Sequence, residues 1–412
     1  MAGLTRRGAL GVGAGALASS ALGAPRGAAR HDVIVVGAGV FGAWTAARLQ
    51  DQGKRVLLLD AWGPAHARAS SGGESRMTRG SYGADAVYTR MAWDSLGDWQ
   101  ALSDAAGLPV FHKAGVLFFF PRQDAFVEAT LKVHRELKLP TQLLDIAQMR
   151  SRFPQIDFAG IELGLYEPAF GALMARRAVQ TLVDRFVRAG GAYRQAAIVP
   201  PDPAVARLDR VVTAAGETLS ATQFVFACGP WLPRLFPDIL GRRIFPTRQE
   251  VFFFAPPAGD ARFGPAQLPG WADFNDGDIY YGFPDLENRG FKIAHDAHGL
   301  PIDPDTVDRT PSAAALADVR SFMARRFPAL AKAPLSEARV CQYENSANGD
   351  LLIDRHPRWA NTVLVGAGSG HGFKHGPAVG RYAAALVTDT LDTTEPRFSL
   401  ASKGETQVRA VH

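Results

Sequence analysis

A glycine-rich turn near the start of the chain constrains the fold most. Gly37-Ala38-Gly39-Val40-Phe41-Gly42 directly follows a short apolar run, Asp32–Val36, which is typical of a strand buried on both faces. A helical pattern then extends from Ala43 to Gln52 and stops at Gly53, and Arg55–Asp60 has the pattern of a second strand. The segment therefore predicts a complete β-α-β unit within about thirty residues.

The glycines and one acid of this unit predict a dinucleotide site. Gly37 permits the tight turn, Gly39 lets the backbone approach a pyrophosphate, and Gly42 lets the helix pack closely on the strand. The helix N-terminus offers N–H groups to phosphates, and Asp60 is placed to accept from ribose hydroxyls. The alternative is a turn that binds nothing. An acid at Asp60 disfavours NADP, but this unit alone does not distinguish FAD from NAD.

Composition bounds the class of protein. The chain has 412 residues, which is enough for more than one domain, and its 47% hydrophobic and 21% charged residues are typical of a soluble globular protein. The net charge of +5 is small and no basic block is interleaved with aromatic residues, which argues against nucleic-acid binding. Cys228 and Cys341 could form one disulfide, but their spacing predicts neither a disulfide framework nor a metal site.

The first thirty residues differ from the rest of the chain. A pair of arginines in Thr5–Leu10 precedes a weakly apolar, Ala/Gly-rich stretch, an order that resembles a bacterial twin-arginine export signal. The alternative is an Ala/Gly tail with two chance arginines. We predict that residues 1–30 are an export signal and that the protein is periplasmic or secreted. No later apolar run is long enough to span a bilayer, so we expect no integral membrane span.

Further elements follow from the same patterns. Residues 61–83 are rich in Gly, Ser and Arg and predict a ligand-contacting loop. We expect strands at 115–120, 222–227, 250–254, 351–354 and 363–366, and helices at 172–190 and 381–390. From about Glu395 onward no pattern is clear, and we expect part of this tail to lack fixed structure.

A second glycine-rich loop decides between the cofactors. Val365–Lys374 predicts a strand that enters a glycine-rich loop and then a helix, and such a loop can bring backbone N–H groups and Lys374 close to a flat, electron-rich ring. This favours FAD. The alternative is a surface turn.

With these features the chain resembles the monomeric sarcosine oxidase and N-methyl amino-acid oxidase family, within the wider D-amino-acid-oxidase-like flavoproteins. The resemblance extends over about residues 31–390. Besides the first glycine turn, it is carried by Glu74-Ser75-Arg76 with Arg79, Ile279–Pro284, Gly290-Phe291-Lys292, Ile302–Thr306, Cys341-Gln342-Tyr343, Ile353–Pro357 and Gly370–Lys374.

The resemblance implies roles for individual residues. A cysteine at the place of Cys341 holds the flavin covalently, and a lysine at the place of Lys292 activates oxygen. Arg76 and Lys374 would bind the substrate carboxylate, and two tyrosines, Tyr281 and Tyr343, would line the pocket. Flavin contacts are implied for Ser75, Arg76, Gly370, Gly372, Phe373 and Lys374. The alternatives are a buried, inert Cys341, solvated surface lysines and tyrosines that only pack the core.

Two positions depart from the family pattern. Gly72 and Asp296 stand where family members carry histidines that face the active site, although His295 lies one place before Asp296. These departures put sarcosine itself in doubt as the substrate. An acid at Asp296 would favour a substrate with an extra cationic group, if it faces the pocket.

The expected fold is α/β plus α+β, in two discontinuous domains. A doubly wound, Rossmann-like FAD domain would comprise residues 31–88, 155–230 and 335–396. A substrate domain with an antiparallel sheet would comprise 89–154 and 231–334, and 397–412 would be a tail. The expected reaction is FAD-dependent oxidation of an amine, from an amino acid or N-alkyl amino acid, by a monomer with O₂ as acceptor. The alternatives are a dehydrogenase that reduces a respiratory carrier and a non-catalytic flavin-binding protein.

Overall fold

We describe a computed structural model of the chain, covering residues 31–275, 277–296 and 299–407. The predicted export signal, residues 1–30, lies outside the described residues. Within the described ranges, none of the helices combines the length and the apolarity that crossing a membrane requires.

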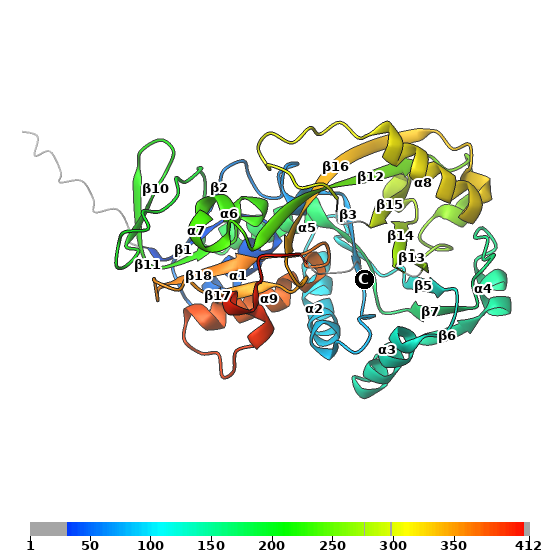
Figure 1. Ribbon diagram of the computed structural model, residues 1–412, viewed down its shortest axis with the longest axis horizontal. Helices are drawn as coiled ribbons and strands as arrows, with labels where there is room; N and C mark the ends of the chain where they lie inside the picture. The colour runs from blue at the N-terminus through cyan, green and yellow to red at the C-terminus, as the bar shows by residue number, and fades with distance from the viewer. Residues whose placement is uncertain (1–30, 276, 297–298, 408–412) are drawn as a thin grey trace, which may run out of the picture. The chain divides into compact units, whose positions relative to one another are not determined.

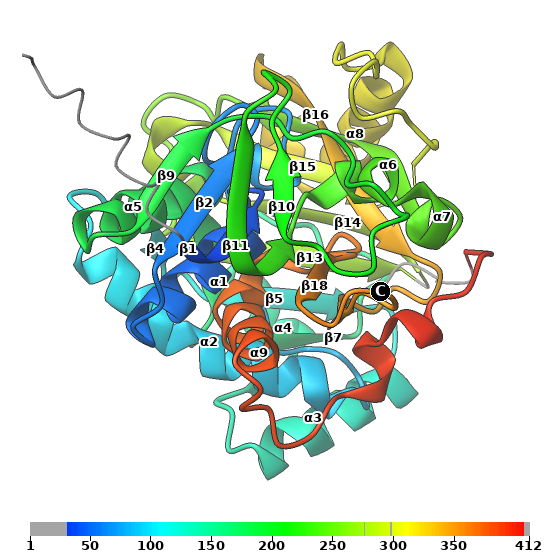
Figure 2. The same ribbon diagram turned by 90° about the vertical axis from the view of Figure 1, so that its left-hand side faces the viewer.

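The first sheet is the predicted dinucleotide-binding sheet. It has seven strands in the order β17-β18-β11-β1-β2-β9, with β10 paired to β11. The pairs β18–β11, β11–β1, β1–β2 and β2–β9 are parallel, and Figure 2 shows β11, β1, β2 and β9 side by side. The strands are β1 (His31–Val36), β2 (Val56–Asp60), β9 (Ala192–Gln195), β10 (Arg210–Val212), β11 (Thr218–Phe226), β17 (Leu352–Arg355) and β18 (Thr362–Gly366).

Apolar side chains cover both faces of this sheet, as predicted for β1. Val33 and Val35 join the core that includes helices α1 (Val40–Asp51), α5 (Ala175–Arg188) and α9 (Gly376–Val387), whereas Ile34 and Val36 join the core on the opposite face. The short helices α6 (Leu232–Leu235) and α7 (Pro237–Leu240) contribute to that opposite core. Alternation along a strand produces these two buried faces.

The second sheet forms the predicted antiparallel region. It has eight strands in the order β16-β12-β15-β14-β13-β5-β7-β6, and among these pairs only β13–β5 is parallel. The strands are β5 (Val116–Phe120), β6 (Gln142–Asp145), β7 (Leu163–Glu167), β12 (Ile244–Phe254), β13 (Gly270–Asn275), β14 (Asp278–Phe283), β15 (Phe291–Asp296) and β16 (Leu335–Ser346). Helix α8 (Ala313–Arg326) packs Val319, Phe322 and Met323 against this sheet (Figure 1).

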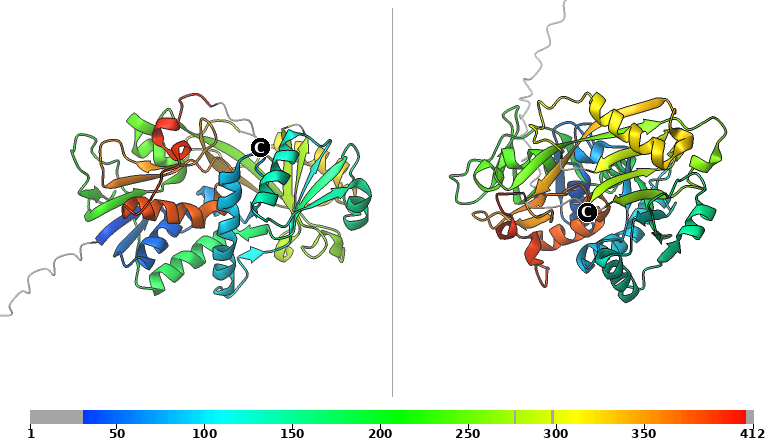
Figure 3. Two further views of the ribbon diagram at one scale, coloured as in Figure 1. Left: turned by 90° about the horizontal axis from the view of Figure 1, so that it is seen from below. Right: turned by 45° about the vertical axis from the view of Figure 1, so that its right-hand side comes forward.

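A small antiparallel sheet and further helices complete the described fold. The small sheet has the order β3 (Ser75–Thr78), β8 (Gly171–Met174), β4 (Phe111–His112). Helix α2 (Ala86–Asp104) lies between the two large sheets (Figures 1 and 3), and the other two helices are α3 (Ala125–Glu136) and α4 (Ile146–Arg152).

The strand pairing corrects several expected boundaries. Residues 155–230 and 335–396 were assigned to the FAD domain, but β7 and β16 belong to the eight-stranded sheet; β16 pairs with β12 along its whole length. Amphipathic alternation is the same in either sheet, so only the partner strand fixes the boundary. The predicted loop 61–83 contains β3, and the helix expected at 172–190 begins at Ala175 because β8 occupies the residues before it.

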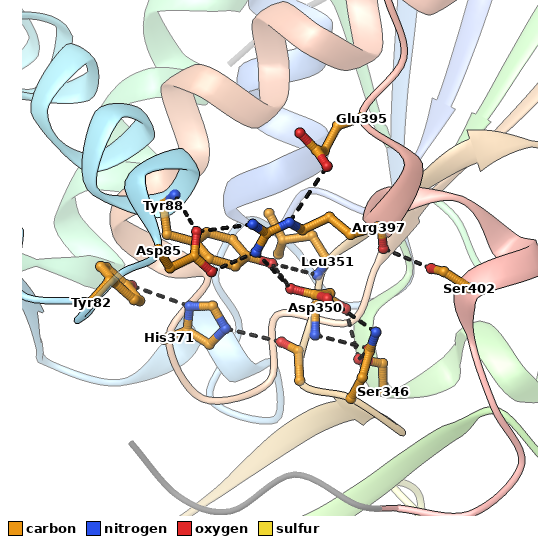
Figure 4. A network of polar contacts seen from close by, with 12 residues as sticks. Tyr82, Asp85, Tyr88, Ser346, Asp350, Leu351, His371, Glu395, Arg397 and Ser402 are labelled. Carbon is orange, nitrogen blue, oxygen red and sulfur yellow. Dashed lines mark hydrogen bonds and ion pairs between the residues drawn. The ribbon is translucent and has the colours of Figure 1, made fainter. Parts of the chain in front are cut away.

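The tail is folded up to residue 407, and residues 408–412 lie outside the described residues. Arg397 donates to Asp85 at 3.1 Å through Nη2 and lies 3.5 Å from Asp350 through Nη1, while Tyr88 donates to Asp350 at 3.0 Å (Figure 4). These charge-assisted contacts tie the tail to α2 and to the turn after β16. Sequence patterns miss them because they join residues far apart in the chain.

Candidate active site

The first glycine turn has the geometry that the sequence predicts. Gly37 has a positive φ of 104°, and a Cβ atom there would lie 2.3 Å from the Ala227 carbonyl oxygen. A Cβ atom on Gly42 would lie 1.8 Å from the Gly37 oxygen, so Gly42 is required for close packing. At Gly39 a Cβ atom would meet only Ser71 Oγ, at 3.4 Å, and the residue lines a cavity. This is the open backbone that a pyrophosphate needs.

Asp60 is fixed at the end of β2 by backbone donors. Its carboxylate accepts from Ala38 N at 2.8 Å, from Trp62 N at 2.9 Å and from Gly63 N at 2.8 Å. Asp60 also lines the cavity, next to Trp62 and Trp231, whose rings lie 4.6 Å apart. The carboxylate is therefore pre-oriented at the dinucleotide end of the cavity.

One cavity of about 560 Å³ extends from this turn to the eight-stranded sheet. Ten of the predicted site residues line it: Gly37, Gly39, Asp60, Arg76, Tyr281, Tyr343, Gly370, Gly372, Phe373 and Lys374. Gly42, Ser75, Lys292 and Cys341 are not among the described lining residues: Gly42 packs the helix, Ser75 and Cys341 contact Arg76, and Lys292 contacts Ser75. The glycine cradle, the open face of Gly39 and the length of the cavity fit FAD.

Arg76 lies close to Ser75, Cys341 and Lys292, three predicted site residues that do not line the cavity. Its Nη1 donates to Ser75 O at 2.9 Å, and its Nη2 donates to Ser70 O at 2.7 Å and to Cys341 Sγ at 3.3 Å. β3 holds Arg76 by pairing with β8 opposite Leu173. The guanidinium is thus oriented by two carbonyls and still borders the cavity.

Lys292 is buried beside Arg76. Its Nζ donates to Ser75 O at 2.9 Å and to Ser75 Oγ at 3.3 Å, between the rings of Phe253 and Phe283. Burial, followed by the charge of Arg76, lowers the pKa of Lys292 well below its ordinary value. Burial therefore makes the protonated form of this amine less favourable, and a negative charge nearby would stabilise that form.

Lys374 belongs to the second glycine loop. It is 4% exposed, and its Nζ donates to His371 O at 2.6 Å. His371 bonds through Nδ1 to Tyr82 Oη at 3.2 Å and through Nε2 to the Gly349 carbonyl at 3.0 Å, which links this loop to the network of Figure 4. The hydrogen bonds of His371 to Tyr82 and to Gly349 therefore fix the loop that carries Lys374.

Two tyrosines and one acid meet where the cavity borders the eight-stranded sheet. Tyr343 Oη donates to Asp296 Oδ1 at 3.1 Å, and all three side chains of Tyr281, Tyr343 and Asp296 line the cavity. Burial, followed by Asp296, raises the pKa of Tyr281 to about 12, so its hydroxyl stays protonated as a donor. Gly370 packs on the Tyr343 ring, since a Cβ atom there would lie 2.7 Å from it.

The structure explains the glycine at position 72 and shows where His295 and Asp296 lie. A Cβ atom on Gly72 would lie 2.1 Å from the His66 oxygen, so no histidine fits there. His295 does not replace the second histidine, because it points to the opposite face of β15 and bonds to Asp318 and Asp278 at 3.1 and 2.7 Å. Asp296 itself faces the cavity.

The two cysteines are both free thiols. Cys341 contacts Arg76, as described above, and Cys228 donates to Val36 O at 3.4 Å. Burial raises the pKa of Cys228 well above its ordinary value, which keeps that thiol unreactive. In the described residues no cluster of acids, histidines or cysteines is placed to hold a metal ion.

One residue of this site escaped the sequence analysis. Glu344 is 5% exposed and lines the cavity, and burial raises its pKa to about 8. Its Oε1 has no hydrogen-bond partner among the described residues. β16 is largely polar, so no local pattern marks Glu344 as buried, although it directly follows the Cys341-Gln342-Tyr343 motif.

Comparisons with known proteins agree with this geometry. Residues 32–386 match the family of FAD dependent oxidoreductases. A monomeric sarcosine oxidase of Streptomyces avermitilis is 33% identical over 368 residues, which cover 87% of this chain and 93% of that protein. An N-methyl-L-tryptophan oxidase of Yersinia pestis is 29% identical over 378 residues, which cover 90% and 99%.

Among solved structures, L-proline dehydrogenase from P. horikoshii has a TM-score of 0.79 at 18% identity, covering 90% of this chain and 97% of that one, a likeness of fold. The chain therefore belongs to the FAD dependent oxidoreductase family. Within that family it is a sarcosine-oxidase-like member. The predicted family, fold class and FAD-dependent enzyme class are confirmed.

Proposed function

We propose that this protein oxidises the amine of an amino acid or N-alkyl amino acid, with O₂ as the electron acceptor. The observation that carries the proposal is the presence of Arg76 and Lys374 on one cavity that also holds the dinucleotide cradle. The names of the relatives, a sarcosine oxidase and an N-methyl-L-tryptophan oxidase, support an amino-acid substrate.

Arg76 and Lys374 would bind the substrate carboxylate. A planar guanidinium and a compact ammonium suit a carboxylate, and both side chains are already oriented by carbonyl groups. The hydroxyls of Tyr281 and Tyr343 would border the amine. A fixed carboxylate orients the substrate C–H bond, so positioning contributes much of the rate. Bound FAD would accept a hydride from that bond, leaving an imine that water hydrolyses to carbonyl plus amine.

Lys292 supports oxygen as the acceptor. Burial lowers the pKa of Lys292, and negative charge that develops beside the amine would favour its protonated form. Lys292 would thereby stabilise the charge that arises as O₂ is reduced to H₂O₂. The alternative is a dehydrogenase with a respiratory acceptor, for which such an amine has no evident use.

We further propose that Cys341 holds FAD covalently. The guanidinium of Arg76 lies 3.3 Å from Sγ, and the sulfur would attack the flavin 8α position. The new C–S bond replaces a C–H bond, and O₂ takes up the two electrons released.

Export and oligomeric state complete the proposal. The arginine pair of Thr5–Leu10 supports twin-arginine export to the periplasm or beyond, and we propose a monomer. Fusing residues 1–30 to a reporter tests the export; replacing both arginines by lysine should retain the reporter in the cytoplasm, and unchanged export would contradict it.

An amine panel tests the activity. Primary and N-methyl amino acids are supplied to the purified holoprotein, with peroxide release and dye reduction measured in parallel. We expect peroxide with at least one amino acid and none with the matching amine that lacks a carboxylate. Dye reduction without peroxide would favour the dehydrogenase alternative.

A further inference from the structure

The sheet face that borders the cavity is made of two neighbouring rows of side chains. Residues paired directly across β5, β13, β14 and β15 form these rows. The first row is Phe118, Ala272 and Tyr281, and the second row is Phe274, Ile279 and Asp296. All six side chains line the cavity. Among the described lining residues from β13 to β15, Asp296 is the only charged one. The second row is thus an apolar strip that ends in a carboxylate.

The positive groups lie toward the other end of this face. Lys292 and Asp296 share one face of β15 and are four residues apart, which places their Cα atoms about 13 Å from each other. Lys292 contacts Ser75, the neighbour of Arg76. Tyr281 lies between the opposite charges and is influenced by both, since Asp296 raises its pKa and Arg76 lowers it. The part of the cavity that borders this sheet face is therefore polarised, with Arg76 on one side and Asp296 on the other.

This pattern fits a ligand with three parts. A carboxylate suits Arg76, an aliphatic stem suits the apolar strip, and a cationic end suits Asp296. Asp296 is held in place by the hydroxyl of Tyr343 at 3.1 Å. Asp296 borders the cavity, so a cationic group that enters the cavity could pair with its carboxylate.

We propose that Asp296 selects amino-acid substrates whose side chain is an aliphatic stem ending in an ammonium or guanidinium group. The proposal rests on the proposed function, because Arg76 and Lys374 hold the substrate carboxylate there. Phe274 and Ile279 contact the stem, and Asp296 pairs with the terminal cation. Asp296 acts on specificity and takes no part in the oxidation itself.

The test compares two substrates of matched length. The values of kcat/KM for lysine and norleucine, each also as the N-methyl derivative, are measured on the holoenzyme. We expect the wild-type ratio to favour the lysine member at least about tenfold, and Asp296→Asn to reduce that ratio by about tenfold or more. The amide keeps an acceptor for Tyr343 and removes the charge. Binding of 6-aminohexanoate against hexanoate, followed by the flavin spectrum, should show the same preference without turnover.

Asp278→Asn is the matched control. Asp278 lies on the same sheet but bonds to His295 on the opposite face, so its loss should leave the ratio intact. A wild-type ratio near one, or an equal loss for both substrates in Asp296→Asn, would overturn the proposal alone. Failure of every amine to reduce the flavin would overturn the proposed function and this proposal with it.

Discussion

The Nη2 atom of Arg76 lies 3.3 Å from the Sγ atom of Cys341, so the residue proposed to bind the substrate carboxylate also contacts the residue proposed to bind FAD. β3 and β16 bring them together from positions 265 apart in the chain. The Arg76 guanidinium can therefore contribute both to binding of the substrate carboxylate and to attachment of FAD at Cys341. Its removal should weaken both.

Arg76→Ala should weaken carboxylate binding by roughly 2–5 kcal/mol, because a partly desolvated charge-assisted contact is lost. Arg76→Lys should recover only part of it, since the planar fork is missing. The measurement is the dissociation constant of a carboxylate inhibitor, with an amine lacking a carboxylate as the control ligand. Equal affinity in wild type and both variants would show that Arg76 does not bind the carboxylate.

Cys341→Ser should release free FAD on acid precipitation, whereas wild type and Cys228→Ser should keep the flavin on the protein. Only Cys341 has a cation beside its sulfur, and the Cys228 thiol is kept protonated by burial. The mass of the tryptic peptide that contains Cys341 provides the direct check. Release of all flavin from wild type in acid would mean that FAD is held only by non-covalent contacts.

Lys292→Met should slow reoxidation by oxygen far more than reduction by substrate, because charge develops only in the oxidative half-reaction. Stopped-flow traces of the two halves provide the measurement. Lys403→Met is the matched control, since Lys403 is also a buried lysine, at 3% exposure, but contacts Arg397 in the tail. Equal losses in both halves of the Lys292 variant would count against oxygen activation.

Glu344 should make the stability of the protein depend on pH. Its pKa is raised from 4.5 to about 8 by burial, so the folded state keeps a proton that the unfolded state loses between these values. The free energy of unfolding should therefore fall as pH rises from about 4.5 through 8. Glu344→Gln should lessen this fall. Denaturant titrations at several pH values compare the two proteins, and identical pH profiles would contradict the assignment.

Local signals in the sequence predicted the dinucleotide unit well. The β-α-β unit is formed by residues that are close together in the chain. Gly37 has the positive φ that its turn requires, and Gly42 packs closely on the Gly37 oxygen. The same holds for the second glycine loop, whose Gly370 and Gly372 line the cavity. Backbone geometry restricts such positions to glycine, so the spacing of glycines in the sequence predicts them.

Long-range pairing was less predictable. The assignment of β16 to the eight-stranded sheet depends on β12, and the order in the tail depends on Arg397 meeting Asp85. Neither partner is marked by a local pattern. Glu344 was missed for the same reason, because a charged residue in a strand reveals its burial only when the opposite elements are placed.

The central claim, that this cavity oxidises an amine with bound FAD, is tested most directly by anaerobic titration of the purified protein with an amino-acid substrate. We expect yellow protein whose flavin absorbance bleaches with one equivalent of substrate per flavin, and returns on admission of oxygen with release of an equal amount of hydrogen peroxide. A colourless protein that takes up no added FAD, or a flavin that no amine bleaches, would contradict the account.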